Sequence, residues 1–208
     1  MNLTEKRDFF KKIYTPVGVV LFKLNISANF ITLLSLLTGT LAAIAYYNGK
    51  LITAASFLLV SGILDLTDGT VARLSGKPTK FGAVFDWIAD KWVDGLILGI
   101  VGYTYGNVFW ATIAVTASLI HSFIKPVVYA EIGYKVKIKG KIQDPLENVG
   151  FFGRPETHIS LILFTILEKL HFPIGLSYGI KFITILTILS LGTRLIYLYK
   201  NYGSEYDE

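Results

Sequence analysis

The stretches 64–73, LDLTDGTVAR, and 82–94, GAVFDWIADKWVD, place five aspartates inside two otherwise apolar segments. A carboxylate at the centre of a membrane helix costs about 2.5–3.5 kcal/mol on insertion scales, so such residues are rare without partners or a function. Two interfacial segments with solvated carboxylates are the simpler alternative, but spacing and depth argue against them. We therefore predict two membrane helices that share a polar site.

Spacing places these aspartates on matching helix faces. Residues three or four positions apart share a face, which groups Asp65 with Asp68 and groups Asp86, Asp90 and Asp94. At 1.5 Å per residue, Asp68 lies about 7 Å and Asp86 about 6 Å inside its helix, and Asp65 and Asp90 lie about 12 Å inside theirs. Four carboxylates at two matched levels predict a cage for hard divalent cations, which take oxygen ligands.

Small residues and one arginine follow the first aspartates. Gly69 and Ala72 leave their helix face without bulk, so a ligand can approach the backbone beside the metals. Arg73, at the mouth of the site, offers a planar fork that suits phosphate. Small residues also let membrane helices pack closely, and that alternative stays open for Gly69.

The composition supports a membrane protein. Of 208 residues, 52% are hydrophobic and 17% are charged, and the mean hydropathy is +0.53. The apolar residues form long blocks rather than a helical or strand period, which indicates lipid as the solvent. The chain has no cysteine, which excludes disulfides and thiolate metal sites.

We expect an all-α, polytopic fold with six transmembrane helices in one domain, residues 1–208. A juxtamembrane segment, 1–28, contains an amphipathic surface helix that breaks near Pro16, and a six-helix bundle, 29–200, precedes a polar tail, 201–208. The fifth span is short for a crossing, and an extension back into the preceding loop would lengthen it. The expected spans are Phe30–Tyr47, Ile52–Arg73, Gly82–Tyr103, Val108–Tyr129, His158–Leu170 and Leu176–Tyr199.

The basic residues predict the orientation. Most of the 20 lysines and arginines fall on the side that holds both termini and the aspartate-rich helix ends. By the positive-inside rule, the termini and the aspartate-rich helix ends face the cytoplasm of a multi-pass cell-membrane protein. The net charge of +5 suits anionic lipid headgroups or phosphorylated substrates, and ordinary topological bias also explains it. No nucleic-acid partner is expected.

From Asp65 to Asp90 the chain reads D-x2-D-G-x2-A-R-x8-G-x3-D-x3-D. This pattern resembles the signature of the CDP-alcohol phosphotransferase family, also called CDP-alcohol phosphatidyltransferases, membrane enzymes of phospholipid biosynthesis. The resemblance implies six membrane helices, a homodimer, and a cytoplasm-facing site with two divalent cations, Mg²⁺ or Mn²⁺.

The resemblance also implies roles for individual residues. Asp65, Asp68, Asp86 and Asp90 are expected as metal ligands, with Asp90 as the general base. The residues expected to bind the CDP donor are Asn29, Thr32, Asp65, Asp68, Gly69, Ala72, Arg73 and Gly82. The first two come from the stretch A-N-F-I-T at 28–32, which is a weaker match to the opening motif of the family.

The expected reaction moves a substituted phosphate group from a CDP-activated lipid, CDP-diacylglycerol or CDP-archaeol, to an alcohol and releases CMP. Metal ions would stabilise the pyrophosphate and the leaving CMP, and a carboxylate would take the alcohol proton. Positioning and electrostatics would supply most of the rate.

The acceptor is predicted to be an inositol phosphate. The run around Asp86, Asp90 and Asp94, and the element Ser122-Phe123-Ile124-Lys125, resemble the branch of phosphatidylinositol-phosphate and archaetidylinositol-phosphate synthases. Lys91 replaces an arginine of that branch, and Thr157 holds another usual arginine position. Lys125, Arg154 and Asp94 are the expected acceptor-binding residues.

Two alternatives stay open. Glycerol phosphate, serine or another alcohol is the alternative acceptor for the same chemistry. A divalent-cation transporter is the alternative class, but it predicts carboxylates through several helices, and the fifth span has only Glu168 at its far end. His121 and His158 lie near helix ends, and we interpret both as hydrogen-bonded structural residues rather than metal ligands.

Overall fold

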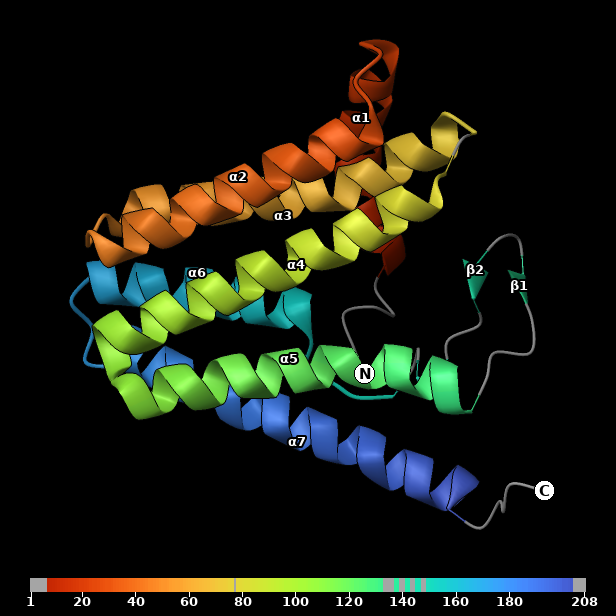
Figure 1. The fold of residues 1–208 in the computed structure, drawn as a ribbon. Helices are drawn as coiled ribbons and strands as arrows, with labels where there is room; N and C mark the ends of the chain where they lie inside the picture. The colour runs from red at the N-terminus through yellow and green to blue at the C-terminus, as the bar shows by residue number, and fades with distance from the viewer. Residues whose placement is uncertain are drawn as a thin grey trace.

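The computed structural model describes residues 7–76, 78–132, 137–138, 141–142, 145–146 and 149–203. Long helices dominate these residues, and most of them lie side by side along one direction (Figure 1). The helices are α1 (Arg7–Lys23), α2 (Ala28–Tyr47), α3 (Leu51–Leu74), α4 (Lys80–Val101), α5 (Val108–Glu131), α6 (Arg154–Lys169) and α7 (Leu176–Tyr202), with a π-helical turn, η2 (Gly102–Gly106), after α4.

Four of the helices, α2, α3, α5 and α7, are long and apolar enough to cross a membrane. The other two predicted spans differ for physical reasons. Helix α4 has 22 residues, but its aspartates and lysines interrupt the apolar sequence. Helix α6 begins at Arg154, four residues before the predicted start, yet it has only 16 residues, or about 24 Å of helix.

Helix α1 corrects the predicted break near Pro16, because the helix runs through that residue. Proline removes one backbone hydrogen bond, and packing can offset that loss. Helix α1 packs against α3, where a Cβ on Gly18 would lie 2.8 Å from Cγ2 of Thr70. Figure 1 shows α1 across one end of the bundle. The side chains of residues 7–13, and residues 1–6 and 204–208 altogether, lie outside the description.

One feature was not predicted: a short antiparallel pair between β1 (Lys137–Ile138) and β2 (Lys141–Ile142) in the α5–α6 connection. The rest of the described chain agrees with an all-helical expectation. The side chains of the basic run 135–141 lie outside the described residues.

Helix α2 organises the bundle, because it packs against both α3 and α4. Small residues allow a close approach: a Cβ on Gly39 would lie 2.6 Å from the methyl groups of Val93. The hydroxyls of Ser35 and Ser61 lie 3.2 Å apart between α2 and α3, and each also donates to the other's backbone carbonyl at 2.9 Å. These contacts fix α2 beside the aspartate-bearing faces.

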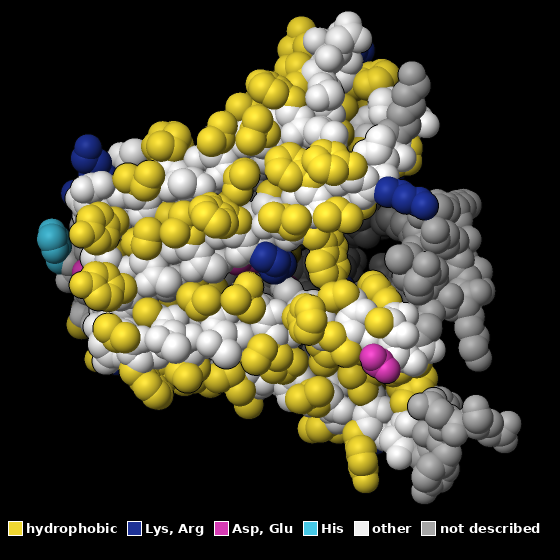
Figure 2. Space-filling model, viewed as in Figure 1, with side chains coloured by type: hydrophobic (Ala, Val, Ile, Leu, Met, Phe, Trp, Pro, Cys, Tyr) yellow, Lys and Arg dark blue, Asp and Glu magenta, His cyan; other side chains and the backbone are white. Residues whose placement is uncertain are grey.

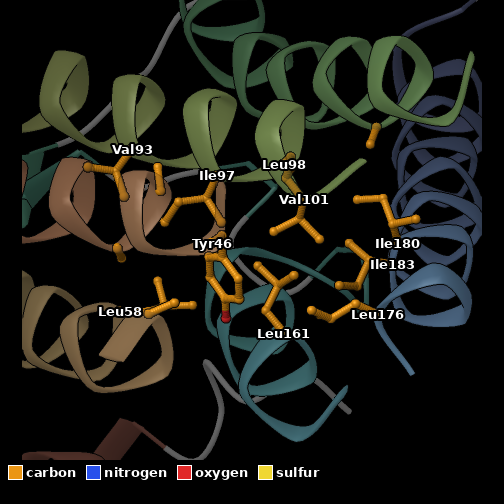
Figure 3. Packing of buried hydrophobic residues seen from close by; sticks show 14 of the residues in the cluster. Tyr46, Leu58, Val93, Ile97, Leu98, Val101, Leu161, Leu176, Ile180 and Ile183 are labelled. Atoms are coloured by element: carbon orange, nitrogen blue, oxygen red, sulfur yellow. The ribbon is translucent and has the colours of Figure 1, made fainter. Parts of the chain in front are cut away.

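Buried side chains of α2, α3, α4, α6 and α7 meet in one apolar cluster (Figure 3). Tyr46 is fully buried in it, and its hydroxyl lies 2.7 Å from that of Thr165. On the outside, hydrophobic side chains cover the helices along most of their length in the view of Figure 2. That surface is what a membrane protein presents to lipid, and the bundle holds its polar site toward one end.

Candidate functional site

Three aspartates meet between α3 and α4. Asp65, Asp86 and Asp90 each offer a carboxylate oxygen, and these oxygens all lie within 4.8 Å of one another. Asp86 and Asp90 lie one turn apart on α4 and therefore point from the same face of that helix, and Asp65 comes from the neighbouring helix α3. We call Asp65, Asp86 and Asp90 the acidic cluster.

The fourth predicted ligand, Asp68, is engaged differently. Its Oδ2 accepts a hydrogen bond of 2.5 Å from the hydroxyl of Thr32 on α2. Both side chains are buried, and the bond ties the start of α2 to α3. Asp68 and Asp86 both line the cavity described below, so Asp68 adjoins the acidic cluster without being one of its three members.

The cluster fits a hard divalent cation. Its donors are carboxylate oxygens, which Mg²⁺ and Mn²⁺ prefer over nitrogen or sulfur. Oδ1 of Asp90 is buried and receives no hydrogen bond, although Nη1 of Arg154 lies 2.7 Å away. A buried carboxylate oxygen with charge contact alone retains a lone pair for a metal ion.

Arg154 lies among the aspartates. Its Nη1 lies 2.5 Å from Asp65 Oδ2 and 2.7 Å from Asp90 Oδ1. Its Nε donates to Asp94 Oδ1 at 3.0 Å. As the first residue of α6, Arg154 thus connects that helix to α3 and α4.

Asp94 is buried beneath this arrangement, with 4% of its side chain exposed. Besides Arg154, Nε2 of His158 lies 3.1 Å from its Oδ1, and Lys91 Nζ donates to its Oδ2 at 3.1 Å. Both oxygens are therefore engaged by the protein itself. This geometry favours Asp94 as a residue that positions Arg154, and it supports the interpretation of His158 as a structural residue.

A cavity of about 960 Å³ opens beside the acidic cluster, between the starts of α2 and α4 and the end of α3. Thr79 and Pro78 of the α3–α4 connection complete its wall, and Asp86 joins it to the cluster. Except for Asp65, every residue predicted to bind the CDP donor lines it: Asn29, Thr32, Asp68, Gly69, Ala72, Arg73 and Gly82.

Gly82 permits the close approach of α2 and α4 in this wall. A Cβ at this position would lie 2.8 Å from Asn29 Oδ1 and 3.0 Å from Thr79 Oγ1. The Gly82 N–H also donates to the hydroxyl of Thr79, the N-cap residue of α4, at 2.9 Å. A side chain here would displace Asn29 from the cavity wall.

Gly82→Ala is therefore expected to raise the KM for the CDP-lipid donor about tenfold, which corresponds to about 1.4 kcal/mol of lost binding. The matched control is Gly95→Ala on the same helix, where an added Cβ meets no atom within 4 Å. Donor titrations of both purified variants check this. Equal donor KM values for the two variants would contradict the role given to Gly82.

A second polar group, absent from the predicted site, holds the loop before α6. Ser190 Oγ accepts from the backbone N–H groups of residues 151 and 152 at 3.2 Å, and Nε2 of His121 lies 3.1 Å from the same oxygen. Arg194 donates to the carbonyl of Val149 at 3.0 Å and to that of His121 at 2.7 Å. These bonds from α7 lead directly to the loop that ends at Arg154.

Arg194 had a detectable signal in the sequence. It is an arginine inside an apolar 27-residue helix, and such residues face the bundle interior with partners. The structure buries it, with 6% exposed. The hydrogen bond between His121 and Ser190 supports the interpretation of His121 as a structural residue, and Lys125 lies one helical turn after His121 on α5.

A model of the family described as CDP-alcohol phosphatidyltransferase matches residues 25–203. An archaetidylinositol phosphate synthase from Methanothermobacter thermautotrophicus is 31% identical over 124 residues, which cover 59% of this chain and 62% of that enzyme. A phosphatidylinositol phosphate synthase from Corynebacterium glutamicum is 30% identical over 185 residues, covering 88% of this chain and 83% of that enzyme.

The fold is similar to that of a Mycobacterium tuberculosis phosphatidylinositol phosphate synthase crystallised with CDP-DAG bound. The TM-score is 0.74 at 22% identity, over 95% of this chain and 99% of that one. The same enzyme has also been crystallised with manganese and citrate. The family model includes α2 to α7, the acidic cluster, Arg154 and every residue that lines the cavity except Phe22. The chain therefore belongs to the CDP-alcohol phosphatidyltransferase family.

Proposed function

We propose that the protein transfers a phosphatidyl-type group from a CDP-linked lipid to a hydroxyl acceptor and releases CMP. The observation that carries this proposal is that the cavity and the acidic cluster are continuous with each other. The cavity is lined by the residues of the D-x2-D-G-x2-A-R pattern, and it reaches the acidic cluster through Asp86. A nucleotide in the cavity would thus place its pyrophosphate next to the carboxylates.

The donor is a CDP-activated lipid, CDP-diacylglycerol or CDP-archaeol. Gly69 and Ala72 leave room along α3, and Arg73 lies on the same wall. The Arg73 guanidinium donates to the Thr70 hydroxyl at 3.2 Å, which keeps the side chain close to its own helix. Its remaining N–H groups suit phosphate oxygens.

Asp65, Asp86 and Asp90, with Asp68 beside them, would hold the two divalent cations, Mg²⁺ or Mn²⁺. When bound, such ions neutralise charge on the pyrophosphate and on the leaving CMP. The chain's own contribution is to hold these carboxylates at fixed positions. Thr32 does so for Asp68, and α2 does so by its packing against both α3 and α4.

Asp90 is the proposed general base. Its Oδ1 receives no hydrogen bond and is therefore ready to accept a proton. The acceptor hydroxyl would lose its proton to Asp90 while its oxygen forms a bond to the lipid-linked phosphorus. The bond from that phosphorus to the CMP oxygen breaks in the same displacement.

An inositol phosphate is the proposed acceptor. Support comes from the relatives, which are named as synthases of inositol phosphate lipids. It comes also from basic side chains of three helices, Lys91, Lys125 and Arg194, which all lie close enough to His121 to act on it electrostatically. A phosphate monoester gains charge-assisted hydrogen bonds from such groups. Glycerol phosphate is the remaining phosphorylated alternative.

A panel of acceptors tests this part of the proposal. The purified protein in a CDP-lipid-containing detergent micelle is offered inositol 1-phosphate, inositol, glycerol 3-phosphate and serine, and the lipid products are read by mass spectrometry. We expect product with inositol 1-phosphate first. A preference for unphosphorylated inositol or serine would overturn the acceptor and leave the transfer chemistry standing.

Lys125→Ala is expected to raise the acceptor KM about tenfold or more, because a charge-assisted hydrogen bond to phosphate contributes about 1.5–3 kcal/mol. The donor KM should change little. Lys169→Ala, which removes an exposed lysine at the opposite end of the bundle, is the control. Steady-state kinetics in both substrates check this, and a higher donor KM with an unchanged acceptor KM would contradict it.

The same proposal includes the membrane arrangement. A single domain of six spans adds α4 and α6 to the four apolar helices, with the polar residues of α4 facing the bundle interior. The cytoplasmic orientation of the site and both termini is supported by the basic residues near those ends. A homodimer remains a prediction from the family resemblance.

A further inference from the structure

Arg154 brings one permanent positive charge into contact with three carboxylates. Its Nη1 contacts Asp65 and Asp90, and its Nε contacts Asp94. Only 16% of the Arg154 side chain is exposed, so water screens these contacts less than it would at a surface. The two ends of the guanidinium thus serve two different sets of partners.

The partners of Nη1 are also members of the acidic cluster. Asp65 and Asp90, together with Asp86, offer the oxygens that lie within 4.8 Å of one another. Mg²⁺ binds oxygen at about 2.0–2.1 Å and demands near-octahedral geometry. A guanidinium nitrogen 2.5 Å from one of these carboxylates and 2.7 Å from another therefore already contacts groups that such an ion would need as ligands. Repulsion between the two positive charges would add to this competition.

The partner of Nε, in contrast, is outside the cluster and firmly held. Asp94 is buried, and His158 and Lys91 fix its two oxygens. The Nε contact to Asp94 is a hydrogen bond of 3.0 Å, whereas the Nη1 contact to Asp90 Oδ1 lacks hydrogen-bond geometry. The Asp90 contact is therefore the one more readily exchanged.

We propose that Arg154 and the divalent cations compete for Asp65 and Asp90, and that Arg154 keeps its bond to Asp94 while its Nη groups exchange partners. This inference rests on the proposed function, because it takes the acidic cluster as the cation site. When Asp65 and Asp90 take a cation, the Nη groups become free donors next to the cluster. They then suit the phosphate of the acceptor, so Arg154 couples cation loading to acceptor binding.

Coupling of this kind is reciprocal. If a cation releases Arg154 for the acceptor phosphate, then the phosphate must also raise the affinity for the cation. We expect this linkage to pass through Arg154, because among the described residues Arg154 is the basic residue that forms ion pairs with cluster carboxylates.

The competition is tested by measuring the binding of Mn²⁺ alone to the 208-residue protein in detergent. The electron paramagnetic resonance signal reports the free Mn²⁺. Arg154→Gln should bind Mn²⁺ at least about fivefold more tightly than the wild type, the lower end of typical coupling. Arg73→Gln is the control, since it removes the same charge from the cavity wall without touching the cluster carboxylates. Its affinity for Mn²⁺ should change clearly less.

Arg154→Gln leaves buried carboxylates without the positive charge of the guanidinium, so this variant can lose its fold. Arg154→Lys retains the charge, but one ammonium group cannot reach Asp94 and both cluster carboxylates in the same geometry. It should also bind Mn²⁺ more tightly than the wild type, and Mn²⁺ should raise its melting temperature more. Inositol 1-phosphate should tighten Mn²⁺ binding in the wild type more than in Arg154→Lys.

The outcomes separate this inference from the proposed function. Wild-type binding of Mn²⁺ with equal or weaker binding by both Arg154 variants would overturn the competition and leave the enzyme proposal intact. No binding of Mn²⁺ by the wild type would instead remove the cation site on which the enzyme proposal depends.

Discussion

Asp90→Asn is expected to lower kcat by about 10²–10⁴-fold, the usual contribution of a positioned general base. Asparagine retains the shape of the side chain but cannot accept the acceptor's proton. Asp90 Oδ1 is buried and receives no hydrogen bond, although it forms an ion pair with Arg154, so this oxygen keeps a lone pair that can accept a proton. The KM for the CDP-lipid donor should change little, because Asp90 is not among the residues that line the cavity.

Single-turnover release of CMP measures this step, with donor affinity and Mn²⁺ affinity determined on the same preparation. The melting temperature must also be compared, because Asp90 is an ion-pair partner of Arg154. If donor and Mn²⁺ affinities fall together with turnover, Asp90 serves mainly as a metal ligand and another group must accept the proton.

Asp86→Asn is expected to reduce kcat at standard Mg²⁺ by about 100-fold or more, because metal ions supply several kcal/mol of charge stabilisation at a phosphoryl group. Asp86 joins the acidic cluster to the cavity, whereas the ion pairs of Arg154 go to Asp65, Asp90 and Asp94. Its replacement should therefore weaken cation binding without displacing Arg154.

Titration with Mn²⁺ distinguishes this effect from a loss of structure. Raised Mn²⁺ should restore part of the activity of Asp86→Asn, since two carboxylates of the cluster remain. Glu131→Gln, an equal loss of charge at the exposed end of α5, is the control and should behave as the wild type. Wild-type metal dependence in Asp86→Asn would contradict the assignment of Asp86.

Helix periodicity was sufficient to predict how the acidic cluster assembles. The positions of Asp65, Asp86 and Asp90 follow from the three- and four-residue spacing and from matched depths in two consecutive helices. The same reasoning predicted the walls of the cavity, because Gly69, Ala72 and Arg73 continue the face that starts at Asp65.

Side-chain partners could not be predicted in this way. Spacing places Asp68 and Asp94 on the correct faces, but it does not show that Thr32 binds the first or that His158 and Lys91 bind the second. Those contacts join helices far apart in sequence, and they depend on the rotation of each helix about its axis. The ion pairs of Arg154 could not be predicted for the same reason, since its reach toward α3 and α4 depends on where α6 begins.

Helices α4 and α6 are not among the four helices that are long and apolar enough to cross a membrane, and α4 shows the limit of a prediction from mean hydropathy. Helix α4 carries its charged residues on a face toward the site, so its average polarity conceals an apolar outer face that includes Val84, Ile88 and Trp92. Pro16 shows the limit of the rule that proline ends a helix. Helix α1 continues through Pro16, and Gly18 allows it to pack closely against Thr70 of α3.

The most direct test of the proposed reaction is to measure the released CMP by chromatography. The donor, the acceptor and the divalent cation are each omitted in turn. The purified protein should release CMP from CDP-archaeol or CDP-diacylglycerol only when inositol 1-phosphate and Mg²⁺ or Mn²⁺ are both present, in equal amount to the lipid product formed. Full CMP release after thorough chelation, or no CMP release with any alcohol acceptor, would contradict a cation-dependent transfer at Asp65, Asp86 and Asp90.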